Sequence, residues 1–121
     1  MEIILDNGGP MLIYLAGPYG DGQPNAKKHV QKAIQMARKV ISKGYVPYVP
    51  HLTHYVAEGW KANPGRPTWL AVHIVILLRC DAVLMLDGWE ESEGAQIEKA
   101  LAERFGIPVY ESLERIDGME T

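Results

Sequence analysis

One segment of the chain combines a glycine, a helix-capping serine and a carboxylate at spacings suited to covalent chemistry. Residues 88–98 read Gly-Trp-Glu-Glu-Ser-Glu-Gly-Ala-Gln-Ile-Glu, and Ser92 predicts the start of a helix. Glu98 then lies within the first two turns, on the side of Gly94, where small side chains leave space for a ligand. The positive end of a helix favours an ionised carboxylate, which is the form a nucleophile requires. A solvated surface glutamate is the alternative interpretation.

A second glycine-rich segment, residues 17–22, reads Gly-Pro-Tyr-Gly-Asp-Gly. Glycines let the backbone approach a ligand closely, so this loop is a candidate for holding a phosphate or a sugar. The loop lacks the Gly-Lys-Ser/Thr of a nucleoside triphosphate-binding loop, and it lacks GxGxxG, the dinucleotide fingerprint. These two absences argue against a nucleoside triphosphate site and against a dinucleotide site.

Histidines and tryptophans give weaker signals. His51 and His54 form an HxxH pattern, but no third ligand stands at a suitable spacing, so we expect a loop wall or aromatic packing and no metal. No cofactor is expected either. Trp89 is the tryptophan best placed to stack a nucleobase, because it lies in a loop beside Ser92, whereas Trp69 lies in an apolar segment typical of the core.

Composition limits the class of protein. The chain has 121 residues, 47% of them hydrophobic and 22% charged, which is typical of one globular domain. Twelve Lys and Arg residues against fifteen Asp and Glu residues give a net charge of −3, so no nucleic acid polymer is expected as a partner. A single cysteine and the lack of a long apolar run or export signal favour a cytoplasmic protein without membrane contact.

The chain alternates between short apolar runs and amphipathic segments. Strands are expected at 12–16, 45–50, 82–86 and 107–110, with helices after Asn25, Pro67 and Ser92 and a loop with a short helical piece at 51–66. This order predicts an α/β fold, a doubly wound parallel sheet of about four strands in a single domain, 11–121, after an N-terminal arm, 1–10. The carboxyl ends of the strands then bring together the loops 17–25, 50–67 and 87–92.

Several details of these elements are also predicted. Asn25 is expected to cap its helix, and Pro47 favours an edge position for the second strand. The helix after Pro67 is apolar on most sides, which predicts core on one side and a partner subunit on the other. For the helix after Ser92, the expected inner face is formed by Ile97, Ala100, Leu101 and Phe105.

Taken in order, several of these motifs resemble the nucleoside 2-deoxyribosyltransferase-like superfamily, including small bacterial and phage members related to the deoxynucleoside 5′-monophosphate N-hydrolases. The matching stretches are Leu12-Ile13-Tyr14-Leu15-Ala16-Gly17-Pro18-Tyr19, Val49-Pro50-His51-Leu52, Trp69-Leu70, Arg79-Cys80-Asp81-Ala82, Gly88-Trp89 and Ser92-x-Gly94-Ala95-x-x-Glu98. Together they span nearly the whole chain, from about Leu12 to Tyr110.

The resemblance implies a flavodoxin-like fold and cleavage or transfer at an N-glycosidic bond of a nucleoside or nucleotide. Glu98 matches the nucleophilic glutamate and Tyr14 the tyrosine that orients it by a hydrogen bond. Ser92 and Gly94 match the loop that holds the sugar or its 5′-phosphate. Gly17, Pro18, Tyr19 and Gly20 match the loop over the substrate, and His51 belongs to the matching turn that is expected to contact it.

One position departs from the family pattern. Where the family usually carries an aspartate, eight residues before Asp81, this chain has His73. A protonated histidine can act as a general acid near neutral pH, and Asp87 is a second candidate to replace the carboxylate. A nucleotide-binding module that does not cleave its ligand is the alternative function.

The resemblance also implies a homo-oligomer, a dimer or larger, with each site near a subunit contact, for which the apolar helix 69–78 is a candidate surface. The identity of the base, ribose versus deoxyribose, hydrolysis versus transfer, and the need for a 5′-phosphate stay open.

Overall fold

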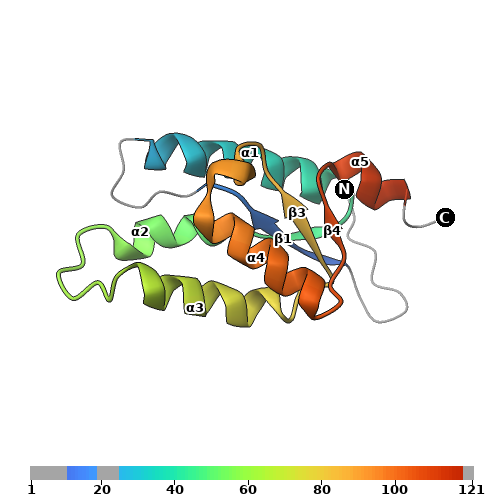
Figure 1. The fold of residues 1–121 in the computed structure, drawn as a ribbon. Coiled ribbons are helices and arrows are strands. Elements are labelled where there is room, and N and C mark those ends of the chain that lie inside the picture. The colour runs from blue at the N-terminus through green and yellow to red at the C-terminus, as the bar shows by residue number, and fades with distance from the viewer. Residues whose placement is uncertain (1–10, 19–24, 119–121) are drawn as a thin grey trace.

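The computed structural model describes residues 11–18 and 25–118 and forms an α/β sandwich around one parallel sheet (Figure 1). Its elements are β1 Leu12–Ala16, α1 Ala26–Ser42, β2 Val46–Tyr48, η1 Pro50–Leu52, α2 Thr53–Ala57, α3 Arg66–Leu77, β3 Ala82–Met85, η2 Trp89–Glu91, α4 Glu93–Arg104, β4 Val109–Tyr110 and α5 Leu113–Gly118. The predicted N-terminal arm, 1–10, lies outside the described residues.

The sheet has four parallel strands in the order β2-β1-β3-β4, which confirms the predicted fold class and places the second strand at an edge. Tyr14 is paired with Tyr48 on one side of β1 and with Val83 on the other. The two central strands are buried along almost their whole length, as expected for parallel strands covered on both faces.

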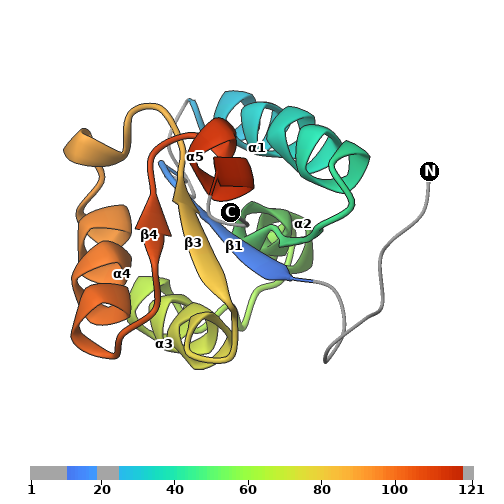
Figure 2. The same ribbon diagram turned by 90° about the vertical axis from the view of Figure 1, so that its right-hand side faces the viewer.

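Helices cover both faces of the sheet, α1 and α5 on one and α3 and α4 on the other (Figure 2). Side chains of β1 alternate between these layers. Ile13 and Leu15 pack with α1 and α5, while Tyr14 and Ala16 face the layer of α3 and α4. The alternation is what directs the hydroxyl of a core tyrosine towards α4.

The structure corrects the predicted inner face of α4. Its buried residues are Ala95, Glu98 and Ala102, whereas Phe105 is 60% exposed. The helix packs closely on the sheet through small side chains, so its larger apolar residues lie at the flanks or in solvent. Glu98 therefore lies on the buried face of α4, although the apolar side chains predicted that the neighbouring face of the helix would be buried.

Two further details differ from expectation. Asn25 makes no side-chain capping hydrogen bond at the start of α1. Helix α5 follows β4 and was not predicted. Its Leu113 and Ile116 complete the core on the side of α1. Ser92, by contrast, caps α4 as expected, since its side chain accepts a hydrogen bond from the backbone N–H of Ala95.

Candidate active site

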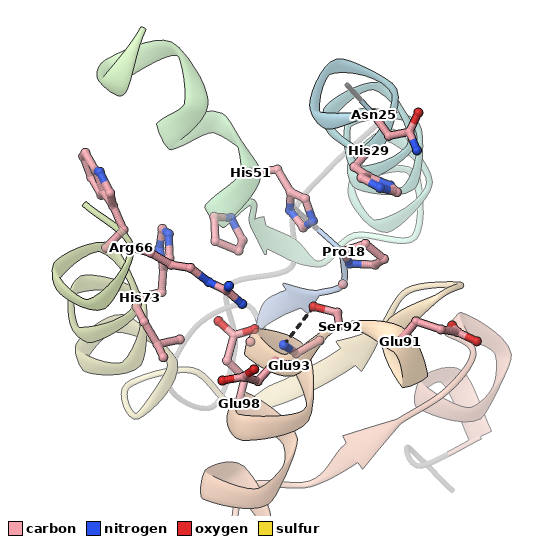
Figure 3. A pocket seen from close by; sticks show the side chains of 16 residues that line it. Pro18, Asn25, His29, His51, Arg66, His73, Glu91, Ser92, Glu93 and Glu98 are labelled. Atoms are coloured by element: carbon pink, nitrogen blue, oxygen red, sulfur yellow. Dashed lines mark hydrogen bonds between the residues drawn. The ribbon is translucent and has the colours of Figure 1, made fainter. Parts of the chain in front are cut away.

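A pocket of about 700 Å³ opens at the carboxyl ends of the strands, where the predicted loops converge (Figure 3). Its walls come from the end of β1, the first turns of α1, α3 and α4, and the η1 segment. The lining residues are Gly17, Pro18, Asn25, His29, Pro50, His51, Arg66, Trp69, Leu70, His73, Glu91, Ser92, Glu93, Gly94, Ala95 and Glu98.

Tyr14 and Glu98 form a buried pair beneath this pocket. The Tyr14 ring is fully buried on β1, and its hydroxyl donates a hydrogen bond to Oε2 of Glu98 on α4. Glu98 itself is 6% exposed and lines the pocket. Tyr48 of the neighbouring strand packs against Tyr14 with ring centroids 5.6 Å apart, which restricts the direction of the hydroxyl.

Burial determines the protonation of this pair. It raises the pKa of Glu98 to about 7, although the hydrogen bond from Tyr14 acts in the opposite direction by stabilising the carboxylate. Burial and the neighbouring Glu98 raise the pKa of Tyr14 well above its ordinary value. Near pH 7 the carboxyl group is thus divided between its acid and ionised forms, while Tyr14 keeps its proton and stays a donor.

The start of α4 supplies a polar wall beside Glu98. The backbone N–H of Ala95 donates to Oγ of Ser92 over 3.2 Å, so Ser92 caps the helix while its own hydroxyl hydrogen can still be donated to a ligand. Gly94 has open space where a side chain would stand. This combination of a hydroxyl, helix N–H groups and free space suits a polar or anionic group of a ligand.

Gly17 forms the opposite wall, where β1 ends against β3. A Cβ atom at this position would lie 2.7 Å from Cβ of Leu86, too close for any residue with a side chain. Pro18 continues this wall into the pocket. The neighbouring Tyr19 and Gly20, which were also expected to contact the substrate, lie outside the described residues.

Of the two histidines of the HxxH pattern, His51 lines the pocket and His54 is buried outside it. His51 is 2% exposed and lies against the backbone of Gly17 and Pro18, and burial lowers its pKa to about 4. His54 lies outside the pocket, with Nε2 3.6 Å from a carboxylate oxygen of Glu58. Among the described residues no group of three or more potential ligands could hold a metal ion.

His73 lies in the pocket, as expected, but its charge differs from the expected one. It is 7% exposed, and burial lowers its pKa to about 4. The ring is therefore neutral at pH 7 and does not carry the proton that a general acid would donate.

Two predicted site residues lie away from the pocket lining. Asp87 is exposed at the end of β3. Trp89 packs against the core beneath α4, and Nζ of Lys99 lies 5.5 Å from its ring centroid. The position of Trp89 in a loop beside Ser92 predicted a ligand contact, but its indole packs on the core and not in the pocket.

Nine of the 16 lining residues were not predicted as site residues, and Asn25, His29, Arg66 and Trp69 are among them. Arg66 is the first residue of α3, and its guanidinium points across the pocket towards the start of α4 (Figure 3). Trp69 follows one turn later and is half-buried. The position of these residues in the fold could have identified them, since α3 begins at the same edge of the sheet as α1 and α4.

Comparison with known proteins assigns the family. Residues 11–111 match the family described as a domain of unknown function, DUF4406, and the chain belongs to that family. A search of curated proteins gives no match. Among the described residues no helix is long and apolar enough to cross a membrane.

The fold is that of two solved 2-deoxyribosyltransferases. The structure of the enzyme from Bacillus psychrosaccharolyticus is 22% identical with a TM-score of 0.57, and the match covers 81% of this chain and 69% of that one. For the enzyme from Leishmania mexicana the identity is 22% and the TM-score 0.57, with 83% and 62% covered. At this identity the likeness establishes the shared flavodoxin-like α/β architecture.

The raised pKa of Glu98 predicts a pH-dependent effect of Glu98→Gln on stability. The folded chain holds the carboxyl proton more tightly than the unfolded chain, so this group's contribution is lost as pH rises from about 4.5 to about 7. Glutamine stays neutral, and the variant should therefore gain about 2–3 kcal/mol relative to the wild type between pH 5 and pH 8.

Urea unfolding at both pH values measures this gain. Glu103→Gln is the matched control, because Glu103 is an exposed glutamate of the same helix whose partner, Lys99, lies at the surface. Its effect should change by less than about 1 kcal/mol. Parallel pH profiles for wild type and Glu98→Gln would contradict the raised pKa.

Proposed function

We propose that the protein cleaves or transfers the N-glycosidic bond of a nucleoside or nucleoside 5′-monophosphate through a covalent intermediate on Glu98. The observation that carries the proposal is the buried Glu98 carboxyl at the pocket wall, held by the hydroxyl of Tyr14. A buried carboxyl oriented by a single donor and facing an open pocket is suited to attack on a sugar carbon.

The reaction has two balanced steps. An ionised oxygen of Glu98 forms a bond to the anomeric carbon, while the bond from that carbon to the base nitrogen breaks and the base leaves with the electron pair. The departing base takes up a proton. Water or a second base then forms a bond to the anomeric carbon, gives up one proton to solvent and displaces Glu98 as the carboxylate. Two displacements at one carbon retain its configuration.

The surrounding residues fit distinct parts of this reaction. The Tyr14 hydroxyl orients one carboxyl oxygen of Glu98 and leaves the other for attack. Ser92 and Gly94 are suited to the sugar or its 5′-phosphate through the hydroxyl and backbone N–H groups. Gly17, Pro18 and His51 form the wall on the side of β1, where they limit the space around the ligand.

The second candidate function is a nucleotide-binding module that does not cleave its ligand. It is favoured by His73, which is neutral at pH 7 and replaces the carboxylate that the resemblance implies. Asp87 is exposed and outside the pocket lining, so its position does not support the role of substitute. In this reading, Glu98 contributes to ligand affinity and not to turnover.

A substrate panel distinguishes the two functions. We expect free or exchanged base from at least one ribo- or deoxyribonucleoside or its 5′-monophosphate, with or without an acceptor base, when the products are separated by chromatography. Glu98→Gln should reduce the rate at least a thousandfold, as loss of a nucleophile does. The wild-type rate should rise with pH through about 7, because the reactive form of Glu98 is the ionised one.

The control for this assay is Glu103→Gln, which should turn over at the wild-type rate. Turnover that survives Glu98→Gln would contradict the proposed nucleophile. Heat protection by a nucleotide without any released base would select the binding module.

We also propose that the chain forms a homo-oligomer through the outer face of α3. Val72, Val75 and Leu78 are 39%, 54% and 38% exposed on successive turns, which leaves an apolar stripe uncovered in the single chain. We expect light scattering at micromolar concentration to give at least a dimer mass, and Val75→Glu to reduce it. A monomeric wild type would contradict this proposal.

A further inference from the structure

The described part of the pocket lining has few side chains that could give a proton to a departing base. An ordinary nucleobase leaves slowly unless it takes up a proton as the glycosidic bond breaks, and a general acid beside it accelerates such a step by about 10²–10⁴. The titratable side chains of the described lining are three histidines, three glutamates and one arginine. The surroundings of each decide whether it can be this acid.

His73 occupies the position where the resemblance implies an acidic side chain, but neither of its ring nitrogens can serve a ligand. Nδ1 is buried, with almost no surface that a ligand could reach. Nε2 lies 3.4 Å from Oγ1 of Thr53, whose hydroxyl already donates its single hydrogen to the carbonyl oxygen of Pro50 over 2.8 Å. Oγ1 of Thr53 is therefore an acceptor, and a hydrogen on Nε2 is directed at it and away from a ligand.

The other two histidines of the wall are also unsuited to proton donation at pH 7. Both ring nitrogens of His51 are buried, and burial lowers the pKa of this ring to about 4. Burial, Lys32 and Lys28 together lower the pKa of His29 from its ordinary value, so this ring is mostly neutral as well. A neutral imidazole is a weak proton donor to a departing base.

The groups beneath the pocket have other roles. The hydroxyl of Tyr14 donates to Oε2 of Glu98, and that carboxyl must be ionised before it can attack a sugar carbon. Glu98 is therefore not the acid for the bond that it breaks. The guanidinium of Arg66 keeps its protons in proteins. Asp87, the second candidate for the missing carboxylate, is exposed outside the lining.

The charge of the described lining is negative at pH 7. Glu91 and Glu93 line the pocket and are exposed, and the ionised form of Glu98 adds a third carboxylate. Arg66 is the one arginine or lysine among the described lining residues, and the three histidines are mostly neutral. A cleft with an excess of one sign of charge attracts ligands of the opposite sign.

We propose that the substrates are nucleosides whose base is already cationic, such as 7-methylpurine nucleosides and pyridinium nucleosides, a class that rests on the proposed function and narrows it. The carboxylate of Glu98 forms a bond to the anomeric carbon, and the bond from that carbon to the base nitrogen breaks. The electron pair of the broken bond neutralises the base, which leaves without taking up a proton. Water then displaces Glu98 from the sugar and gives up one proton to solvent.

The first test measures binding of sugar-free probes, so it requires no glycosyl chemistry. The pairs are 1-methylnicotinamide with nicotinamide, and the cation 7,9-dimethylguanine with 9-methylguanine, and their members differ by one methyl group and one positive charge. Dissociation constants come from NMR titration. We expect the cation to bind the wild type about tenfold more tightly in at least one pair, because of the excess of carboxylates.

Two double variants examine the origin of this preference. Glu91→Gln/Glu93→Gln removes two carboxylates from the lining and should reduce the preference for the cation at least threefold. Glu103→Gln/Glu111→Gln makes the same change of charge at exposed glutamates outside the lining, and it should leave the preference unchanged. Melting curves confirm that both variants are folded.

The second test compares turnover of 7-methylguanosine with guanosine, and of their 2′-deoxy forms, by chromatography of the released base after subtraction of the protein-free rate. The kcat/KM of the methylated member should be at least a hundredfold higher, since only the neutral base needs the acid that the described lining does not supply. Nicotinamide riboside should also be cleaved, and Glu98→Gln should abolish each of these activities.

The outcomes separate this substrate class from the proposed function. Cleavage of guanosine or its 2′-deoxy form at a rate similar to that of the methylated partner overturns the class and supports the glycosyl function. Equal binding of both members of each pair, or a preference that is unchanged in Glu91→Gln/Glu93→Gln, also overturns the class. Selective binding of the cations with no base released from any nucleoside supports the selection by charge and rejects the glycosyl function.

Discussion

The hydrogen bond between Tyr14 and Glu98 is the interaction on which the candidate site depends. It joins the central strand β1 to α4, and it keeps an ionisable carboxyl inside the protein. Burial of a carboxyl is unfavourable for its charged form, and the raised pKa of Glu98 expresses that cost. A chain that retains such a group at a pocket wall accepts lower stability for a reactive position.

Topology explains why the other site residues meet this carboxyl. Because the strands are parallel, each connection leaves the sheet at its carboxyl edge, and α1, α3 and α4 contribute residues to the pocket at that edge. Arg66 enters the pocket from the first turn of α3, and Ser92 from the N-cap of α4. The unusual feature of this pocket is its set of buried neutral histidines, His51 and His73, which accept or donate hydrogen bonds without adding charge at pH 7.

Local sequence pattern was sufficient for the fold and for part of the site. The apolar run of β1, the periodic face of α1 and the serine cap of α4 each depend on neighbouring residues, so they were predicted at nearly their observed positions. Glu98 was selected from small neighbours on its helix face and from family resemblance, and the structure places it in the pocket.

The features that were missed depend on long-range packing. Phe105 is exposed because α4 packs on the sheet through Ala95 and Ala102. The pattern of apolar residues does not show that the helix packs through its small side chains. Trp69 was assigned to the core and Trp89 to the site, and the structure reverses their positions relative to the pocket. The charge of His73 depends on how deeply it is buried, and its burial is decided by the folded arrangement of α3 and the segments beside it.

The most direct test of the central claim is to look for sugar attached to Glu98. Wild-type protein would be mixed with the nucleosides and nucleotides of the panel, quenched in acid within the first turnover, and studied by intact-mass and peptide mass spectrometry. A covalent intermediate on Glu98 predicts a mass increase equal to one glycosyl group on the peptide that contains Glu98, and none in Glu98→Gln. Base release with no adduct on that peptide, or an adduct at another residue, would contradict it.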